Sequence, residues 1–286
     1  MHAGPALEAI ASGCHVLVEK PLASSLEDCD RMIAAAERQG VVLATISQRR
    51  FYEPCLRIRD AIDRGGLGTP ILGSAVMHGW RDEAYYRSDP WRGSWSGEGG
   101  GVLVNQAPHQ IDLLLWYLGE VTELYGHWAN VNHPYIEVED TAVAVLKFRS
   151  GALATLCVSN AQRPAIHGRV TVAGSNGATV GVQTDGGAMF IAGMSPIAEP
   201  PFNHLWTLPG EQDRLKDWRE SDVRIFTSID PTVHYHRLQI EDLVRAIQQS
   251  RTPLVTGADG RRCVEIFTAI YRCQREKRPI SFPLAG

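Results

Sequence analysis

The sequence predicts a mixed α/β protein, in which the end of a doubly wound parallel sheet precedes a larger unit with an open, mainly antiparallel sheet. Short apolar runs at residues 15–18 and 41–46 alternate with helical patterns, as parallel strands buried on both faces do. After Phe51, apolar and polar residues alternate in segments joined by turn residues, which is typical of antiparallel hairpins. One chain is therefore expected to combine two kinds of sheet.

Helices flank the two parallel strands. Residues 2–12 carry apolar side chains at helical spacing, and Gly13 ends this helix as a C-cap glycine does. Ser24 or Ser25 caps a second helix, which runs to Gly40. Because ligands of such α/β sheets bind beyond the carboxyl ends of the strands, we expect the functional site there.

The rest of the chain is expected to form hairpins and helices. Alternation around a turn predicts hairpins that pair residues 141–148 with 152–159 and residues 170–173 with 178–182. Apolar residues at helical spacing predict helices at residues 54–64, 233–249 and 261–275. The stretch 195–230 is rich in proline and charge and is assigned as loop with short elements.

The composition indicates a globular protein with a small polar molecule as its partner. The chain has 286 residues, 44% of them hydrophobic, and its net charge of -4 provides no basic field for a nucleic acid or an anionic membrane. No apolar stretch reaches the ~18–20 residues of a membrane span, and the start lacks a signal-peptide layout. Six scattered cysteines without a C-x-x-C pair suit free thiols and a cytoplasmic location.

Glu19-Lys20-Pro21 directly follows the first parallel strand, where an α/β sheet presents its ligands. A lysine in this place is able to donate to a hydroxyl or carbonyl of a substrate. The alternative is that Lys20 is a solvated loop charge. The tripeptide alone does not decide between the two interpretations.

A glycine run at residues 99–101 opens a predicted helix that places Asn105, His109 and Asp112 on one face. Apolar residues continue this helix to Trp116, so polar groups on it are costly to bury unless they are paired or face a wet pocket. His109 is a candidate general base, because histidine exchanges a proton near neutral pH. The alternative is a hydrogen-bonded core histidine.

Residues 85–95 concentrate aromatic side chains and arginines. Tyr86, Trp91 and Arg92 are candidate substrate ligands, because rings stack on the C–H faces of a sugar and guanidinium groups donate to hydroxyls or a carboxylate. Trp91 and Trp95 could equally belong to the core. No metal site is expected, because the sequence has neither an H-E-x-x-H motif nor a thiolate cluster.

Three motifs in this order resemble the glucose–fructose oxidoreductase, inositol dehydrogenase and rhizopine-catabolism (Gfo/Idh/MocA) family. They are V-L-V-E-K-P-L at residues 16–22, S-Q-R-R-F-Y-E-P at 47–54 and G-G-G-x-x-x-N-Q-A-P-H-Q-I-D at 99–112. The resemblance covers nearly the whole chain. It implies an oxidoreductase that uses NAD or NADP on a secondary alcohol of a sugar, cyclitol or related polar ring. It also implies a Rossmann domain, a second domain with an open sheet, and a homodimer or homotetramer.

The resemblance also implies roles for single residues. Lys20 would orient and polarise the reacting carbinol beside the nicotinamide, and His109 would be the general base during oxidation. Asn105 would be the third catalytic residue and would position substrate, and Asp112, on the same predicted helical face, is a further candidate substrate ligand. The residues implied at the cofactor are Glu19, Lys20, Pro21 and Arg50, with a cis peptide bond between Lys20 and Pro21.

The sequence departs from the family pattern in two places. Asn105 stands where the usual pattern has aspartate, so a neutral amide replaces a carboxylate. A Rossmann domain opens with a G-x-G-x-x-G motif, which is missing here. We therefore interpret residues 1–50 as an incomplete Rossmann domain with its last two strands only, and residues 51–286 as the substrate-binding and oligomerisation domain. The alternatives are a non-catalytic ligand-binding regulator of the same fold and an inactive fragment.

Overall fold

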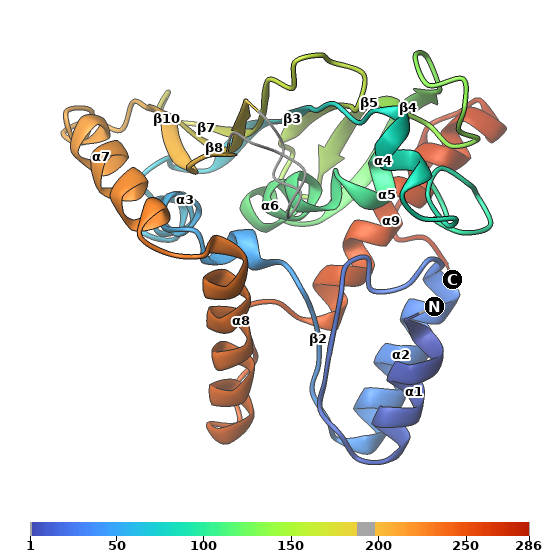
Figure 1. Ribbon diagram of the computed structural model, residues 1–286. Coiled ribbons are helices and arrows are strands. Elements are labelled where there is room, and N and C mark those ends of the chain that lie inside the picture. The colour runs from blue at the N-terminus through green and yellow to red at the C-terminus, as the bar shows by residue number, and fades with distance from the viewer. Residues whose placement is uncertain (1, 188–197, 286) are drawn as a thin grey trace.

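The computed structural model describes residues 2–187 and 198–285. Their strands form two sheets, and helices pack against these sheets (Figure 1). A parallel pair, β1-β2, comes first in the chain. A mixed sheet follows with the order β10-β8-β7-β3-β6-β5-β4-β11, and β9 pairs with β8. Within the described residues, β3 and β6 form the parallel pair of this larger sheet, and its other pairings are antiparallel. The predicted fold class is confirmed.

The parallel unit has the expected helix–strand order. Its elements are α1 (Ala3–Ala11), β1 (Val16–Val18), α2 (Leu26–Gln39) and β2 (Leu43–Thr45). Ser25 caps α2 by accepting a hydrogen bond from Asp28 N at 3.2 Å, and Gly40 ends that helix with a left-handed φ of 66°. The strand β2 is buried throughout, whereas Val16 and Leu17 of β1 are only half-buried, so the expected burial on both faces applies to β2 alone.

The larger unit begins with the short helix η1 and ends with β11. Its elements are η1 (Gln48–Phe51), α3 (Glu53–Asp63), β3 (Pro70–His78), α4 (Glu83–Arg87), α5 (Val102–Asn105), α6 (Pro108–Leu118), β4 (Val121–Ala129), β5 (Thr141–Phe148), β6 (Leu153–Ser159), β7 (His167–Gly174), β8 (Thr179–Gly187), β9 (Ala198–Glu199), β10 (Phe202–Trp206), α7 (Arg214–Thr227), α8 (Pro231–Gln248), α9 (Gly257–Glu276) and β11 (Ile280–Ser281). Both predicted hairpins occur, as β5-β6 and β7-β8.

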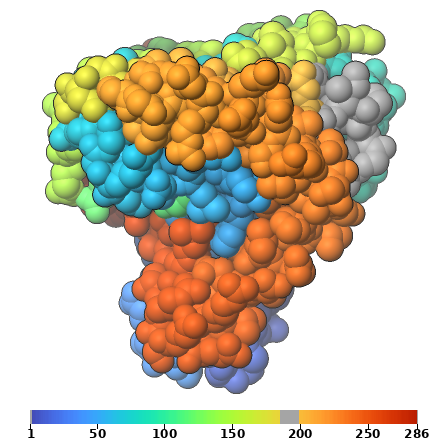
Figure 2. Space-filling view, turned by 90° about the vertical axis from the view of Figure 1, so that its left-hand side faces the viewer, coloured from blue at the N-terminus to red at the C-terminus, as the bar shows by residue number. Residues whose placement is uncertain are grey.

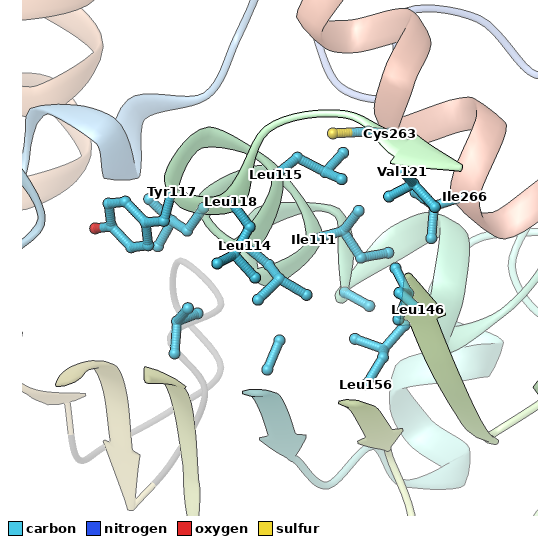
Figure 3. Close-up of a cluster of buried hydrophobic side chains, with 14 of the residues drawn as sticks. Ile111, Leu114, Leu115, Tyr117, Leu118, Val121, Leu146, Leu156, Cys263 and Ile266 are labelled. Carbon is cyan, nitrogen blue, oxygen red and sulfur yellow. The ribbon is translucent and has the colours of Figure 1, made fainter. Parts of the chain in front are cut away.

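Helices α6 and α9 cover one face of the large sheet and build the core with it. Ile111 and Leu114 of α6 lie with Leu146 of β5 and Ile266 of α9 in one buried cluster (Figure 3). Gly73 of β3 allows the close approach of α6, because a Cβ at this position would lie 2.5 Å from Leu118 Cδ1. Burial of these apolar side chains is the main source of stability.

The C-terminal helix α9 joins the two units. It packs on β4 of the large sheet and also on α2 and β2 of the parallel unit. At its N-terminal end, a Cβ on Gly260 would collide with the Thr45 hydroxyl, so this helix end fits tightly on β2. The space-filling view shows a broad upper part and a narrower lower part, with α8 and the residues after it in front of the N-terminal segment (Figure 2).

The stretch 195–230 contains more regular structure than expected. Its first three residues lie outside the described part of the chain, and the remainder contains β9, β10 and the 14-residue helix α7. The helix packs Leu215, Trp218 and Phe226 against the core, and a 2.6 Å ion pair between Arg57 and the buried Asp222 adds to this docking. Periodicity could not show this partner, because it comes from a distant segment.

Candidate active site

A pocket lies at the carboxyl ends of β1 and β2, between the parallel unit and helices α6 and α9. Its walls are formed by Lys20, Pro21, Leu22, Thr45, Ile46, Ser47, Pro108, His109, Asp112, Val255, Gly260 and Cys263. The structure therefore brings Lys20 and His109 into one pocket, as the roles implied by the family resemblance require. In the described part of the chain, no group of three or more His, Cys, Asp or Glu side chains is arranged to hold a metal ion.

Lys20 is a half-buried donor. Its Nζ donates to the main-chain oxygen of Asn105 at 2.7 Å and lies 3.4 Å from Asn105 Oδ1. Burial lowers the Lys20 pKa to about 8, with Glu19 opposing this change and Arg49 adding to it. The Lys20-Pro21 peptide bond is cis, as the resemblance implied. These contacts do not fit a solvated loop charge, whereas Glu19 is exposed to solvent.

His109 lies in the first turn of α6 and faces the pocket. Burial lowers the His109 pKa well below its usual value, and the positive charges of Arg49 and Lys20 lower it further. The imidazole is therefore neutral at neutral pH and has a nitrogen able to accept a proton. Its position in the pocket wall suits a proton acceptor better than a core histidine.

Asn105 and His109 belong to two helices, not to the single helix that the sequence predicted. The short helix α5 ends at Asn105, and α6 begins at Pro108. Proline lacks the N–H that a continuing helix needs, and its ring clashes with the preceding turn. The helix is therefore interrupted before Pro108. The break turns the Asn105 side chain toward Lys20, while His109 and Asp112 stay on α6.

Glu98 is a site residue that the sequence analysis missed. Its Oε1 accepts a hydrogen bond from Asn105 Nδ2 at 2.5 Å, and its Oε2 accepts one from Gly93 N at 2.7 Å. Burial raises the Glu98 pKa, and the two hydrogen bonds and the charges of Arg92 and Lys20 oppose this rise. The only sign of this role in the sequence is the position of Glu98, an acidic residue directly before the glycine run.

The aromatic segment divides into two groups. The Arg92 guanidinium lies 4.3 Å from the ring centroids of both Tyr85 and Trp91, and it donates to the Tyr85 hydroxyl at 2.7 Å. That hydroxyl also accepts from Asn105 Nδ2 at 3.3 Å, so Arg92 and Trp91 connect to the site through Tyr85. Tyr86 is buried beside this group, and its hydroxyl accepts from Asn160 Nδ2 at 3.4 Å.

Asp112 and Arg50, which were expected at the substrate and the cofactor, bind each other. Arg50 donates to the two carboxylate oxygens of Asp112 at 2.6 and 2.9 Å, and the Ser47 hydroxyl also donates to this carboxylate. Arg50 further lies 3.3 Å from Asp259 of α9. This buried, bidentate ion pair ties η1, α6 and α9 together beneath the pocket.

The glycine run serves the packing of its own loop. Glu139 is fully buried and accepts hydrogen bonds from the N–H groups of Gly101 and Leu103 at 3.0 Å and from the Tyr271 hydroxyl at 2.9 Å. A Cβ on Gly100 would collide with Tyr271, and one on Gly101 would collide with the Glu139 main chain. Glu139 therefore positions the start of α5, and through it Asn105.

The fold and the pocket define a two-part α/β protein in which a lysine and a histidine meet at the junction of a parallel unit and an open sheet. A family model described as "Oxidoreductase family, NAD-binding Rossmann fold" matches residues 1–47. A second one, described as "GFO/IDH/MocA C-terminal domain", matches residues 55–180.

Two curated proteins show the relationship over most of the chain. The uncharacterized oxidoreductase YrbE of Bacillus subtilis is 30% identical over 272 residues, which cover 87% of this chain and 72% of the relative. Myo-inositol 2-dehydrogenase of Thermotoga maritima is 34% identical over 273 residues, which cover 93% of this chain and 72% of the relative. The chain therefore belongs to the Gfo/Idh/MocA oxidoreductase family.

Solved structures agree with this assignment. The WlbA dehydrogenase from Bordetella pertussis, in complex with NADH and UDP-GlcNAcA, superposes with a TM-score of 0.84 and 28% identity. The match covers 99% of this chain and 77% of that structure. The predicted family membership is thus confirmed by sequence and by fold.

Proposed function

We propose that this chain carries the catalytic pocket of an oxidoreductase that transfers hydride between NAD or NADP and a secondary alcohol of a sugar, cyclitol or related polar ring. The observation that carries the proposal is the pairing of Lys20 and His109 in one pocket beyond the parallel strands. Names of relatives support the substrate class, because one acts on myo-inositol and another was crystallised with UDP-GlcNAcA.

The side chains that line the pocket suit the reactive end of a nicotinamide cofactor. Lys20, Pro21 and the residues that end β2 would face the nicotinamide, and the buried Thr45 hydroxyl has no hydrogen-bond partner among the described residues. The printed sequence contains no glycine-rich turn of the kind that binds a pyrophosphate, so the fit concerns the nicotinamide end. When bound, the cofactor supplies the hydride acceptor.

The chain's own residues would handle the proton. The Lys20 ammonium donates to the alcohol oxygen and orients it, while the neutral imidazole of His109 takes the hydroxyl proton on a ring nitrogen. Asn105 holds Lys20 in place through its main-chain oxygen. Arg92 and Trp91 would contact the ring of the substrate, since Tyr85 joins them to Asn105.

The test measures formation of reduced nicotinamide by the full chain with a panel of ring alcohols and with both cofactors. We expect His109→Ala to lower turnover on the order of 10²–10⁴, because a general base is lost. His127→Ala is the matched control, since His127 lies exposed on β4, away from the pocket.

Two outcomes would contradict the proposal. Near-parent turnover of His109→Ala would make His109 a structural residue. Binding of a ring alcohol by calorimetry without turnover with either cofactor would favour the non-catalytic regulator, which the neutral Asn105 would also suit.

Two further assignments complete this proposal. We place the domain boundary near residue 50, although α9 packs on both units. We also propose a homodimer or homotetramer in the cytoplasm: the open face of the large sheet exposes apolar side chains, and all six cysteines are free thiols, as in a reducing compartment.

A further inference from the structure

Asn105 lies between a cation and an anion. Its Oδ1 is 3.4 Å from Lys20 Nζ, and its Nδ2 donates to Glu98 Oε1 at 2.5 Å. A carboxylate only accepts hydrogen bonds and an ammonium only donates them, so these two neighbours determine which way the amide points. The side chain of Asn105 thus bridges the Lys20 ammonium and the Glu98 carboxylate.

Glu98 is held in this position by its own loop. Its second oxygen accepts from Gly93 N at 2.7 Å, and its main-chain N–H donates to Ser94 O at 2.9 Å. The charges that act on Lys20 are those of Glu19, Arg49, Glu98 and Arg81, and the neighbouring His109 is neutral at neutral pH. Of the two carboxylates, Glu19 is exposed to water and salt, whereas Glu98 is half-buried and reaches Lys20 through the amide.

We propose that Glu98 supplies, through Asn105, the negative charge that the aspartate of the usual family pattern would supply at position 105, and that it thereby holds the Lys20 ammonium in the site. This inference rests on the function proposed above. In this chain, the negative charge lies on residue 98, whereas the usual family pattern has it on residue 105. Glu98 is a positioning residue, because it acts on Lys20 through Asn105.

The test measures the pKa of Lys20 directly, from the pH dependence of its acetylation by acetic anhydride in the full chain, with the modified peptide quantified by mass spectrometry. Glu98→Gln keeps an acceptor for Gly93 N and removes the charge. We expect the Lys20 pKa to fall from about 8 by about 1, because an opposite charge favours the ammonium. Glu98→Gln combined with Asn105→Asp returns the charge and should restore the pKa to the parent value or above it.

Glu137→Gln is the matched control. Its carboxylate accepts a hydrogen bond from Trp95 N at 3.2 Å, on the same loop, but its contacts do not include Asn105 or Lys20. We expect this variant to leave the Lys20 pKa unchanged. If Glu98→Gln behaves like Glu137→Gln, Glu98 only supports the loop and the proposal is wrong.

A second variant, Glu98→Asp, allows the same test if Glu98→Gln does not fold. Glu98→Asp keeps the charge and withdraws it from Asn105 by one methylene, so the Lys20 pKa should lie between the parent and the Glu98→Gln value. A parent value in a folded Glu98→Asp variant, together with a failed rescue by Asn105→Asp, would also overturn the proposal.

The two proposals fail in different ways. Acetylation needs no turnover, so a chain that oxidises no ring alcohol but shows the expected change in the Lys20 pKa would contradict the function alone. A chain that is active, with a Lys20 pKa that does not respond to Glu98, would contradict the role of Glu98 alone.

Discussion

Lys20 and His109 are both affected by burial, and the consequences for the two residues differ. Burial disfavours the charged form of each, so the Lys20 pKa falls to about 8 and the His109 pKa falls well below its usual value. At neutral pH the lysine still carries its proton and the histidine has lost its own. One residue is thus ready to donate and the other to accept, without any change in protonation before the reaction.

These two pKa changes predict the pH dependence of kcat/KM. A base is active when deprotonated, so the rate should stay level from pH 8 down through the usual histidine range and fall only in more acidic solution. A donor is active when protonated, so the rate should fall above a pH of about 8. Lys20→Arg stays protonated at every accessible pH and should remove this alkaline limb. An alkaline limb that persists in Lys20→Arg would belong to another group.

At the scale of elements, the break between α5 and α6 decides the geometry of the site. Pro108 prevents one continuous helix, and Glu139 caps the start of α5 through the N–H groups of Gly101 and Leu103. Asn105 therefore ends a short helix whose first turn is held by a buried carboxylate. The site depends on this cap, because α5 carries the oxygen that binds Lys20.

The cap formed by Glu139 makes the free energy of unfolding depend on pH. Burial raises the Glu139 pKa from 4.5 to about 7, so the folded protein binds this proton more tightly than the unfolded chain does. The resulting stability is present below about pH 4.5 and is lost as the pH rises through about 7. Glu139→Gln is always neutral and should flatten this dependence, which amounts to about 3 kcal/mol at most.

Chemical denaturation between pH 5 and 8 measures the effect of Glu139→Gln. Glu137→Gln, an exposed neighbour, should keep the pH dependence of the parent. Equal pH dependence in the parent and in Glu139→Gln would show that Glu139 is ionised in the folded protein throughout this range.

At the scale of the whole molecule, the large sheet has one covered and one open face. Helices α6 and α9 cover the first, and alternate residues of the strands point to the second. Leu72, Val145 and Leu153 on neighbouring strands are 53%, 57% and 55% exposed. Exposed apolar side chains on neighbouring strands favour contact with another protein surface, and a second copy of the chain would provide one that is self-complementary.

If the chain forms the proposed oligomer, Val145→Lys combined with Leu153→Glu should dissociate it into monomers, with little effect on folding because both side chains are exposed. Light scattering after size-exclusion chromatography measures the molar mass. Val233→Lys on α8, a residue that is 63% exposed, is the control and should leave the mass unchanged. A parent chain that is already monomeric at all concentrations would contradict the oligomer.

The sequence by itself determined the fold class and most helices and strands, which follow from local periodicity and from capping residues. It placed Lys20 beyond a parallel strand, where ligands bind, and the family resemblance that its motifs carry implied that His109 shares the site. The tertiary structure alone decided the partners of the polar groups. It paired Arg50 with Asp112, joined Glu98 to Asn105 and docked α7 through Arg57 and Asp222.

The physical reason is the range of the interactions. Hydrophobic periodicity is written within a dozen neighbouring residues, whereas a buried charge pairs with whichever partner the folded chain brings within about 3 Å. Lys20 and Asn105 are 85 positions apart, and Tyr271 and Glu139 are 132 apart. No local pattern specifies such a pair, so only the packed structure shows which carboxylate serves the lysine.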